Sequence, residues 1–184
     1  MVAEDRSMSA ASGARAPFLW GPLTPFALAV AVAAAAIDQA AKLWLLFVVD
    51  LPARGIVRLT PFLDLVLTWN TGISYGLLRQ EGPLGQWALL ALKAIAVALL
   101  WIWLSRASSR LTALSLGLII GGAIGNAIDR FAYGAVVDFV LFHINTASFS
   151  FNWYVFNLAD VAIVAGVIGL LFETLIGTGA AKAP

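Results

Sequence analysis

The chain has 184 residues, of which 61% are hydrophobic and 11% charged, and its formal net charge is +1. Soluble domains are roughly 45–50% apolar and about 25% charged. The composition therefore predicts a polytopic membrane protein that forms one domain over residues 1–184. The sequence has no basic block, which argues against a nucleic-acid partner. It has no cysteine and one histidine, so disulfides and thiol nucleophiles are excluded, and no metal or cofactor is expected.

Four apolar stretches of helical length follow a polar N-terminal segment. Residues 1–22 show no hydrophobic pattern and are expected to be disordered. The expected membrane spans are about 24–49, 86–104, 111–130 and 155–176. A cleaved signal peptide is the competing interpretation of the first stretch, but apolar residues resume after Lys42 and favour a span. The predicted fold class is an all-α membrane protein with four transmembrane helices.

Two long connections, residues 50–85 and 131–154, join these spans. Residues 56–75 are rich in β-branched and aromatic types, with Pro61 as a break, and predict short strands in a small sheet at the membrane surface. The short loop between the second and third spans contains Arg106 and Arg110. An excess of positive charge marks cytoplasmic loops, so we expect both termini in the cytoplasm and both long connections outside it.

Asp138 and Asp160 are the candidate catalytic residues. Asp138 lies in the second connection and Asp160 at the start of the last span. If both flanking helices span the membrane, this connection leaves and re-enters it at one interface, so the two carboxylates can meet. Two adjacent carboxylates cannot both ionise cheaply, and the pair is expected to share one proton. The ionised member can take a proton from water while the protonated member polarises a carbonyl oxygen. This chemistry hydrolyses an amide without a metal or a covalent intermediate.

Three further polar residues, Asn126, Asp129 and Arg130, share one helical face near this pair. They either simply close the third span, where a helix C-terminus favours a cation, or present hydrogen-bond donors to peptide carbonyls. Asn157 is placed to cap the last span and to orient Asp160.

The remaining polar residues of the spans allow simpler interpretations. Asp38 and Lys42, one helical turn apart, form a neutralising pair, or else they brace the outer connections or contact a substrate. Lys93 is interpreted as structural, with its ammonium reaching toward the surface. His143 is interpreted as a surface or packed histidine, and Trp153 and Tyr154 as part of an interfacial aromatic belt rather than a binding site.

The sequence resembles the lipoprotein signal peptidase (signal peptidase II) family from about Thr24 to Ile176. The resemblance rests on five motifs in the family's order and spacing: DQAAK at 38–42, NTGISYGLL at 70–78, GNAIDR at 125–130, VVDF at 136–139 and FNLAD at 156–160. Many members have Ala or Val and then Ala-Phe after the NTG, where this chain has Ile73, Ser74 and Tyr75. That departure concerns the segment that contacts the substrate in the family, not the candidate catalytic residues.

The resemblance implies an aspartyl endopeptidase of the bacterial inner membrane, with its active site on the extracytoplasmic side. Such enzymes remove the signal peptide from prolipoproteins just before a diacylglyceryl-modified cysteine. The family's catalytic pair matches Asp138 and Asp160. Its substrate-contacting and supporting residues match Asn70, Asn126, Arg130 and Asn157, and its other supporting positions match Asp38, Lys42 and Asp129. The Asn70 segment matches an extracytoplasmic sheet that cradles the substrate. The expected partners are this lipid-modified substrate and membrane lipids, with the chain as a monomer.

Three other classes of protein remain as alternatives. In a metalloenzyme, hard oxygen ligands for Mg²⁺ or Ca²⁺ would come from Asp129, Asp138, Asp160, Asn126 and Asn157. Loss of activity in a chelator would identify such an enzyme. A proton-coupled transporter would need polar groups near the bilayer midplane, where only Asp38 and Lys93 are candidates. A non-catalytic membrane scaffold would not need the two aspartates to converge.

Overall fold

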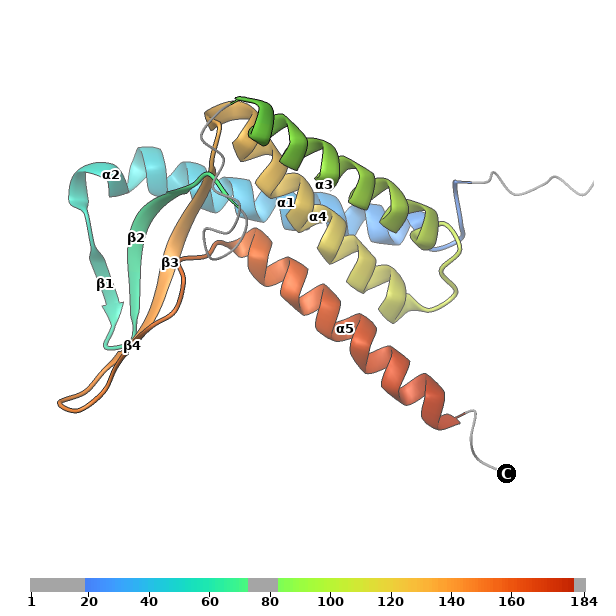
Figure 1. Cartoon of the computed structure of the whole chain (residues 1–184). Coiled ribbons are helices and arrows are strands. Elements are labelled where there is room, and N and C mark those ends of the chain that lie inside the picture. The colour runs from blue at the N-terminus through green and yellow to red at the C-terminus, as the bar shows by residue number, and fades with distance from the viewer. Residues whose placement is uncertain (1–18, 73–82, 181–184) are drawn as a thin grey trace, which may run out of the picture.

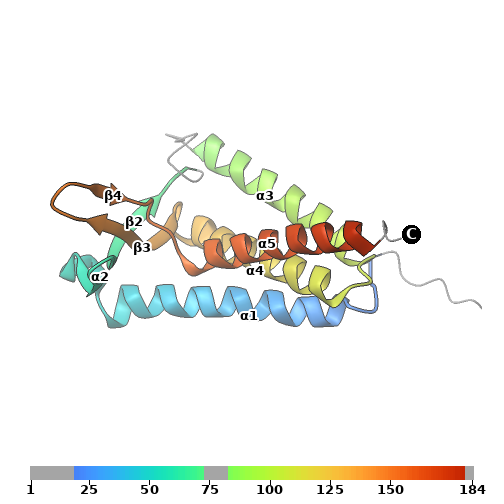
Figure 2. The same ribbon diagram turned by 90° about the horizontal axis from the view of Figure 1, so that it is seen from below.

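A computed structural model describes residues 19–72 and 83–180 of the chain, and Figure 1 shows its arrangement. The helices are α1 (Thr24–Leu43), α2 (Leu51–Arg54), α3 (Pro83–Leu104), α4 (Arg110–Tyr133) and α5 (Leu158–Ala180), and a π-helical turn, η1 (Trp44–Val48), continues α1. The strands are β1 (Val57–Thr60), β2 (Leu63–Asn70), β3 (Val136–Asn145) and β4 (Ser150–Asn152). The strands lie at one end of the helical bundle, and the start of α1 and the end of α5 lie at the other end (Figures 1 and 2).

Three helices of the described chain are long and apolar enough to cross a membrane: Thr24–Val48, Arg110–Tyr133 and Leu158–Leu175. The apolar stretch of α3, Leu90–Leu104, is shorter. The prediction of a membrane protein is therefore confirmed, whereas a count of four spans stays a prediction. The expected disorder of residues 1–22 falls largely outside the described residues.

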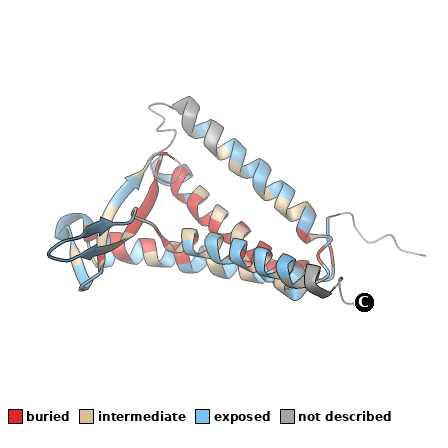
Figure 3. Ribbon diagram, turned by 60° about the horizontal axis from the view of Figure 1, so that its bottom comes forward, coloured by how far each residue is buried: buried red, intermediate tan, exposed pale blue. Residues whose placement is uncertain are grey.

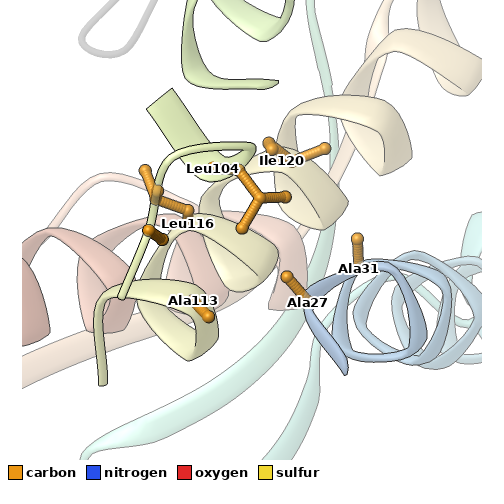
Figure 4. Packing of buried hydrophobic residues seen from close by; sticks show 7 residues of the cluster. Ala27, Ala31, Leu104, Ala113, Leu116 and Ile120 are labelled. Atoms are coloured by element: carbon orange, nitrogen blue, oxygen red, sulfur yellow. The ribbon is translucent and has the colours of Figure 1, made fainter. Parts of the chain in front are cut away.

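Helix α4 is the centre of the bundle and contacts α1, α3 and α5. Its first turn is capped by Ser109, whose hydroxyl oxygen accepts from the backbone N–H of Leu111 at 3.1 Å. It ends at Gly134, which has a φ of 77° and so adopts the left-handed conformation that favours glycine. The helix continues three residues beyond 130, the expected end of this span. Small alanines and Leu104, Leu116 and Ile120 fill the core between α1, α3 and α4 (Figure 4).

Two glycines of α4 set how closely the neighbouring helices approach. A Cβ atom at Gly121 would overlap the backbone of Ala31 in α1, and one at Gly122 would overlap the carbonyl oxygen of Ala159 in α5. Glycine at such positions lets two helix backbones come together. The position of the first turn of α5 therefore depends on Gly122.

The four strands form an antiparallel sheet in the order β1-β2-β3-β4. The prediction of strands around Pro61 is confirmed for the described part of that segment, and residues 73–75 of the expected region lie outside it. Strands β3 and β4 of the second connection were not predicted. Val136 to Asn145 contains the β-branched and aromatic residues of a strand. The short interval 146–149 before β4 has no clear turn pattern, so the hairpin was not predicted.

The first half of β3 is buried where the sheet meets the helices (Figure 3). Phe139 packs with Leu45 of η1 and Leu51 of α2 in a second apolar cluster. The isolated pairing of Val140 with Phe156 then connects β3 to the segment that enters α5. These contacts fix the start of β3 beside the start of α5.

We predict that Gly122→Ala destabilises the protein by about 1–3 kcal/mol, because the added methyl group separates α4 from α5. The midpoint of thermal unfolding in detergent should fall. Ala132→Ser, at an exposed position of the same helix, is the matched control and should leave the midpoint near that of the wild type. An unchanged midpoint in Gly122→Ala would contradict the close packing of these two helices.

Candidate functional site

A pocket of about 260 Å³ lies where the end of α4, the strands β2 and β3, the start of α5 and the middle of α3 meet. It is lined by five of the residues that the sequence singled out: Asn70, Asn126, Arg130, Asp138 and Asp160. The rest of its wall is largely apolar and includes Val136, Ile163 and Val164. The structure thus brings the two candidate catalytic carboxylates into one partly apolar hollow.

Asp138 lies on β3 and is only 2% exposed. Its two carboxylate oxygens accept hydrogen bonds from Nδ2 of Asn70 at 2.9 Å and from Nδ2 of Asn157 at 2.6 Å. Burial raises the pKa of Asp138 to about 6, and the nearby charge of Asp160 adds to this rise, whereas the two amide donors oppose it. Asp138 therefore binds a proton more readily than an ordinary aspartate.

Asp160 lies in the first turn of α5 and is held by a reciprocal cap. The backbone N–H of Asp160 donates to Oδ1 of Asn157 at 3.0 Å, and the backbone N–H of Asn157 donates to Oδ2 of Asp160 at 3.2 Å. Two orphan donors of the helix terminus are satisfied in this way. The N-terminus of a helix is a position that favours a negatively charged group.

Two amide side chains connect the carboxylates. Asn157, which is fully buried, donates from Nδ2 to Asp138 and also to Oδ1 of Asn126 at 3.0 Å. Asn126 in turn donates from Nδ2 to Oδ1 of Asp160 at 2.9 Å. The four residues form a continuous hydrogen-bonded chain from one carboxylate to the other, which fixes their relative position.

A buried ion cluster lies beneath this chain. The Lys42 ammonium contacts Asp38 at 2.7 Å and Asp129 at 2.6 Å, and the three side chains are at most 2% exposed. Lys42 also donates to Oδ1 of Asn126 at 3.2 Å. A buried cation between two carboxylates is stable only when each member keeps its partners.

Each carboxylate of this cluster also holds the backbone just before a candidate catalytic residue. Oδ1 of Asp38 accepts from the N–H of Ala159 at 2.9 Å. Oδ2 of Asp129 accepts from the N–H of Val137 at 3.1 Å. Two interpretations were left open for Asp38 and Lys42. The structure shows a neutralising ion pair that also holds the start of α5 in place.

Arg130 lies in the last turn of α4, where a cation is favourable, and its side chain also reaches beyond the helix. Its Nη2 donates to the carbonyl oxygen of Gly72 at 2.8 Å, beside the end of β2. Arg130 thereby connects α4 to the segment that carries Asn70, while it also lines the pocket.

Sequence reasoning missed three residues at or near the site. Lys93, interpreted as structural, lines the pocket from α3 and lies within electrostatic reach of both carboxylates. Tyr154, interpreted with Trp153 as part of an interfacial belt, lines the pocket as well. Gln39 supports Asp129 with a 2.7 Å hydrogen bond from Nε2. An ionisable residue in an apolar span is the signal that could have identified Lys93.

The described part of the chain shows no cluster of side chains that would support the alternative of a metalloenzyme. No group of three or more His, Cys, Asp and Glu side chains in residues 19–72 and 83–180 is arranged to hold a metal ion. Asp129, one of the proposed oxygen ligands, is occupied by Lys42, Gln39 and the backbone of Val137.

Comparisons with known proteins agree with this architecture. Residues 30–176 match the family model described as signal peptidase (SPase) II. A lipoprotein signal peptidase of Nitrobacter hamburgensis is 66% identical over 157 residues, which are 85% of this chain and 96% of that protein. Another from Rhodopseudomonas palustris is 58% identical over 164 residues, which are 88% of this chain and 100% of that protein.

A solved structure with the same fold is described as a bacterial membrane enzyme determined by the in meso method at 2.3 Å resolution. It is 23% identical, has a TM-score of 0.70, and the match covers 87% of this chain and 93% of that one. The fold and the site thus define a helical membrane protein with a polar pocket at one end of its bundle. The chain belongs to the signal peptidase II family of proteases. The family resemblance predicted from the five motifs is confirmed.

We predict that Lys42→Met destabilises the protein by about 3–5 kcal/mol, because it leaves Asp38 and Asp129 buried without a cation. Thermal unfolding in detergent measures the loss. The triple variant Asp38→Asn, Lys42→Met, Asp129→Asn removes the charges together and should recover part of that stability. If Lys42→Met unfolded at the wild-type temperature, the ion cluster would not be the brace that its geometry indicates.

Proposed function

We propose that this protein is an aspartyl endopeptidase that removes the signal peptide from diacylglyceryl-modified prolipoproteins. The family membership and the names of the relatives support the substrate class. The observation that carries the chemistry is the pair Asp138 and Asp160, which line one pocket and are joined by two amide side chains.

The two carboxylates have different roles in this proposal. Asp138, whose pKa is raised to about 6, carries the proton, and Asp160 at the N-terminus of α5 is ionised. A water molecule between them loses a proton to Asp160 and attacks the scissile carbonyl carbon, while Asp138 donates its proton to the carbonyl oxygen. The tetrahedral diol then collapses, and a proton passes to the leaving nitrogen. The products are a carboxylate on the signal peptide and a free amine on the lipid-modified cysteine.

The surrounding side chains support this chemistry by position and charge. Asn126 and Asn157 fix the relative position of the two carboxylates by hydrogen bonds, and Asn70 donates to the second oxygen of Asp138. Arg130 and Lys93 add two positive charges to the pocket wall. These cations offset the two acidic groups and offer donors to the carbonyl groups of a bound peptide.

The substrate approaches from the lipid. The pocket adjoins an apolar groove of about 440 Å³ along α5, and the two hollows share Tyr154, Asp160 and Val164. Acyl chains can therefore remain in the bilayer while the scissile bond reaches the carboxylates. In this proposal the protein lies in the bacterial inner membrane as a monomer, with cytoplasmic termini and with the site and the sheet on the outer side.

We predict that Asp138→Asn and Asp160→Asn each lower the rate of prolipoprotein cleavage by about 10²–10⁴-fold or more, because each removes one proton-transfer group. Cleavage of a diacylated prolipoprotein by the purified protein, in the presence of a chelator, measures the effect. Asp50→Asn changes an exposed aspartate outside the pocket and is the matched control. Near-wild-type cleavage by either pocket variant would refute the proposed pair, and loss of wild-type activity in chelator would favour a metalloenzyme.

We also predict the direction of the pH dependence. Because Asp138 must be protonated to act as the acid, kcat/KM should fall as pH rises through about 6, the value to which burial raises its pKa. The hydrogen bond from Asn70 opposes that rise, so Asn70→Leu should move this alkaline limb to higher pH. A kcat/KM that stays constant between about pH 5 and 8 would contradict the assignment of the proton to Asp138.

A further inference from the structure

Lys93 lines the pocket but takes no part in the proposed proton transfers. It lies in the middle of α3, about 15 Å from the start of the helix. Val97 and Leu100, four and seven residues later, pack against the core of the bundle, and residues at this spacing share one helical face. Ile95, on the other side of the helix, is 59% exposed. Lys93 therefore points into the bundle and reaches the pocket from the side of the helices rather than from the sheet.

The ammonium of Lys93 differs from the other cations near the carboxylates because its donors are unused. Lys42 is enclosed by the two carboxylates of the ion cluster. Arg130 donates to backbone carbonyl groups of α4 and of the segment after β2. Lys93 forms no hydrogen bond or ion pair with any residue of 19–72 or 83–180, and it interacts with the charges around it only at a distance. A cation without a partner in an apolar helix is costly and indicates a functional position.

Cleavage creates a new negative charge where negative charges are already present. In the proposed mechanism Asp138 and Asp160 hold one proton and carry one negative charge between them. The ion cluster beneath them, two carboxylates with one ammonium, adds a second, and Arg130 offsets only one of the two.

Hydrolysis of the amide consumes one water molecule and gives a carboxylic acid and an amine. A proton then passes from the acid to the amine, so the cleaved signal peptide ends in a carboxylate. Like charges at close range repel one another strongly in a partly apolar site. This product therefore needs a cation whose donors are not already occupied.

We propose that Lys93 binds the carboxylate at the new C-terminus of the cleaved signal peptide. This inference rests on the proposed function and assigns a ligand to one side of the same pocket. Both α3 and α5 pack on α4 (Figure 2), and the pocket is bounded by Lys93 from α3 and by Ile163 and Val164 from α5. A signal peptide is an apolar segment, so it remains on this side, among the helices. The ammonium thus lies where the new carboxylate is left.

A preference for the product over a neutral peptide follows from this assignment. The intact substrate has an uncharged amide at the same place and gains little from the ammonium. A charge-assisted hydrogen bond forms only when the peptide ends in a carboxylate. The protein should therefore be inhibited by its own cleaved signal peptide, and less by the same peptide with an amide at its C-terminus.

The test compares two synthetic peptides on the full chain in detergent. Both have the sequence of a signal peptide up to the residue before the cysteine, and one ends in a carboxylate and the other in a carboxamide. At about pH 7 the carboxylate is ionised. Calorimetry measures binding, and cleavage of a diacylated prolipoprotein measures inhibition. The wild type should bind the acid about tenfold or more tightly than the amide.

Substitutions of Lys93 show whether its charge carries this preference. Lys93→Met removes the charge and keeps much of the side-chain volume, so it should reduce the affinity for the acid to about that for the amide and leave the amide unchanged. Lys93→Arg keeps the charge and should retain most of the preference. Arg54→Gln removes an exposed positive charge outside the pocket and is the matched control, which should retain all of it.

Three results would overturn the inference: equal binding of acid and amide by the wild type, a preference that persists in Lys93→Met, or an equal loss of affinity for both peptides in that variant. The second result would assign the carboxylate to Arg130, and the third would make Lys93 a structural residue. If Lys93→Met fails to fold, the wild-type comparison and Lys93→Gln decide.

The proposed function fails or stands separately. A wild-type protein that cleaves prolipoprotein but binds acid and amide alike would disprove only the role of Lys93. A wild-type protein that cleaves no prolipoprotein would disprove the proposed function itself.

Discussion

The Lys42 ammonium, buried between Asp38 and Asp129, is the interaction on which the rest of the site depends. Burying these two carboxylates in the bundle without a cation would be costly. As anions they accept the backbone N–H groups of Ala159 and Val137. Each of these residues directly precedes an aspartate of the pocket, so one charge cluster positions two segments that are distant in sequence.

That arrangement explains why two aspartates can approach each other at the edge of an apolar bundle. The carboxylate of Asp160 is stabilised by the N-terminus of α5, and its position is fixed by the reciprocal cap with Asn157. Asp138 is buried on a strand, and its raised pKa follows mainly from that burial. The two carboxyl groups therefore lie in different surroundings, one buried on a strand and the other at a helix N-terminus.

Much of the candidate site could be predicted because burying charged residues beside apolar spans costs free energy. Aspartates at such positions therefore indicate a function, and the cap by Asn157 followed from its position before α5. The charge of Lys93 in an apolar span was a signal of function, but the places of Lys93 and Gln39 at the site depend on which segments pack together. No local pattern shows that the middle of α3 reaches the pocket wall or that Gln39 supports Asp129.

Strand β3 shows how one short segment serves two environments. Its regular alternation puts Asp138 toward the apolar pocket and His143, an odd number of residues later, toward the opposite polar face. A shift of one residue in its pairing with β2 would exchange these faces. The buried contacts of Phe139 with η1 and α2, and the bond from Val137 to Asp129, set that register. The ion cluster beneath the pocket therefore also helps to set which side chains lie on each face of the sheet.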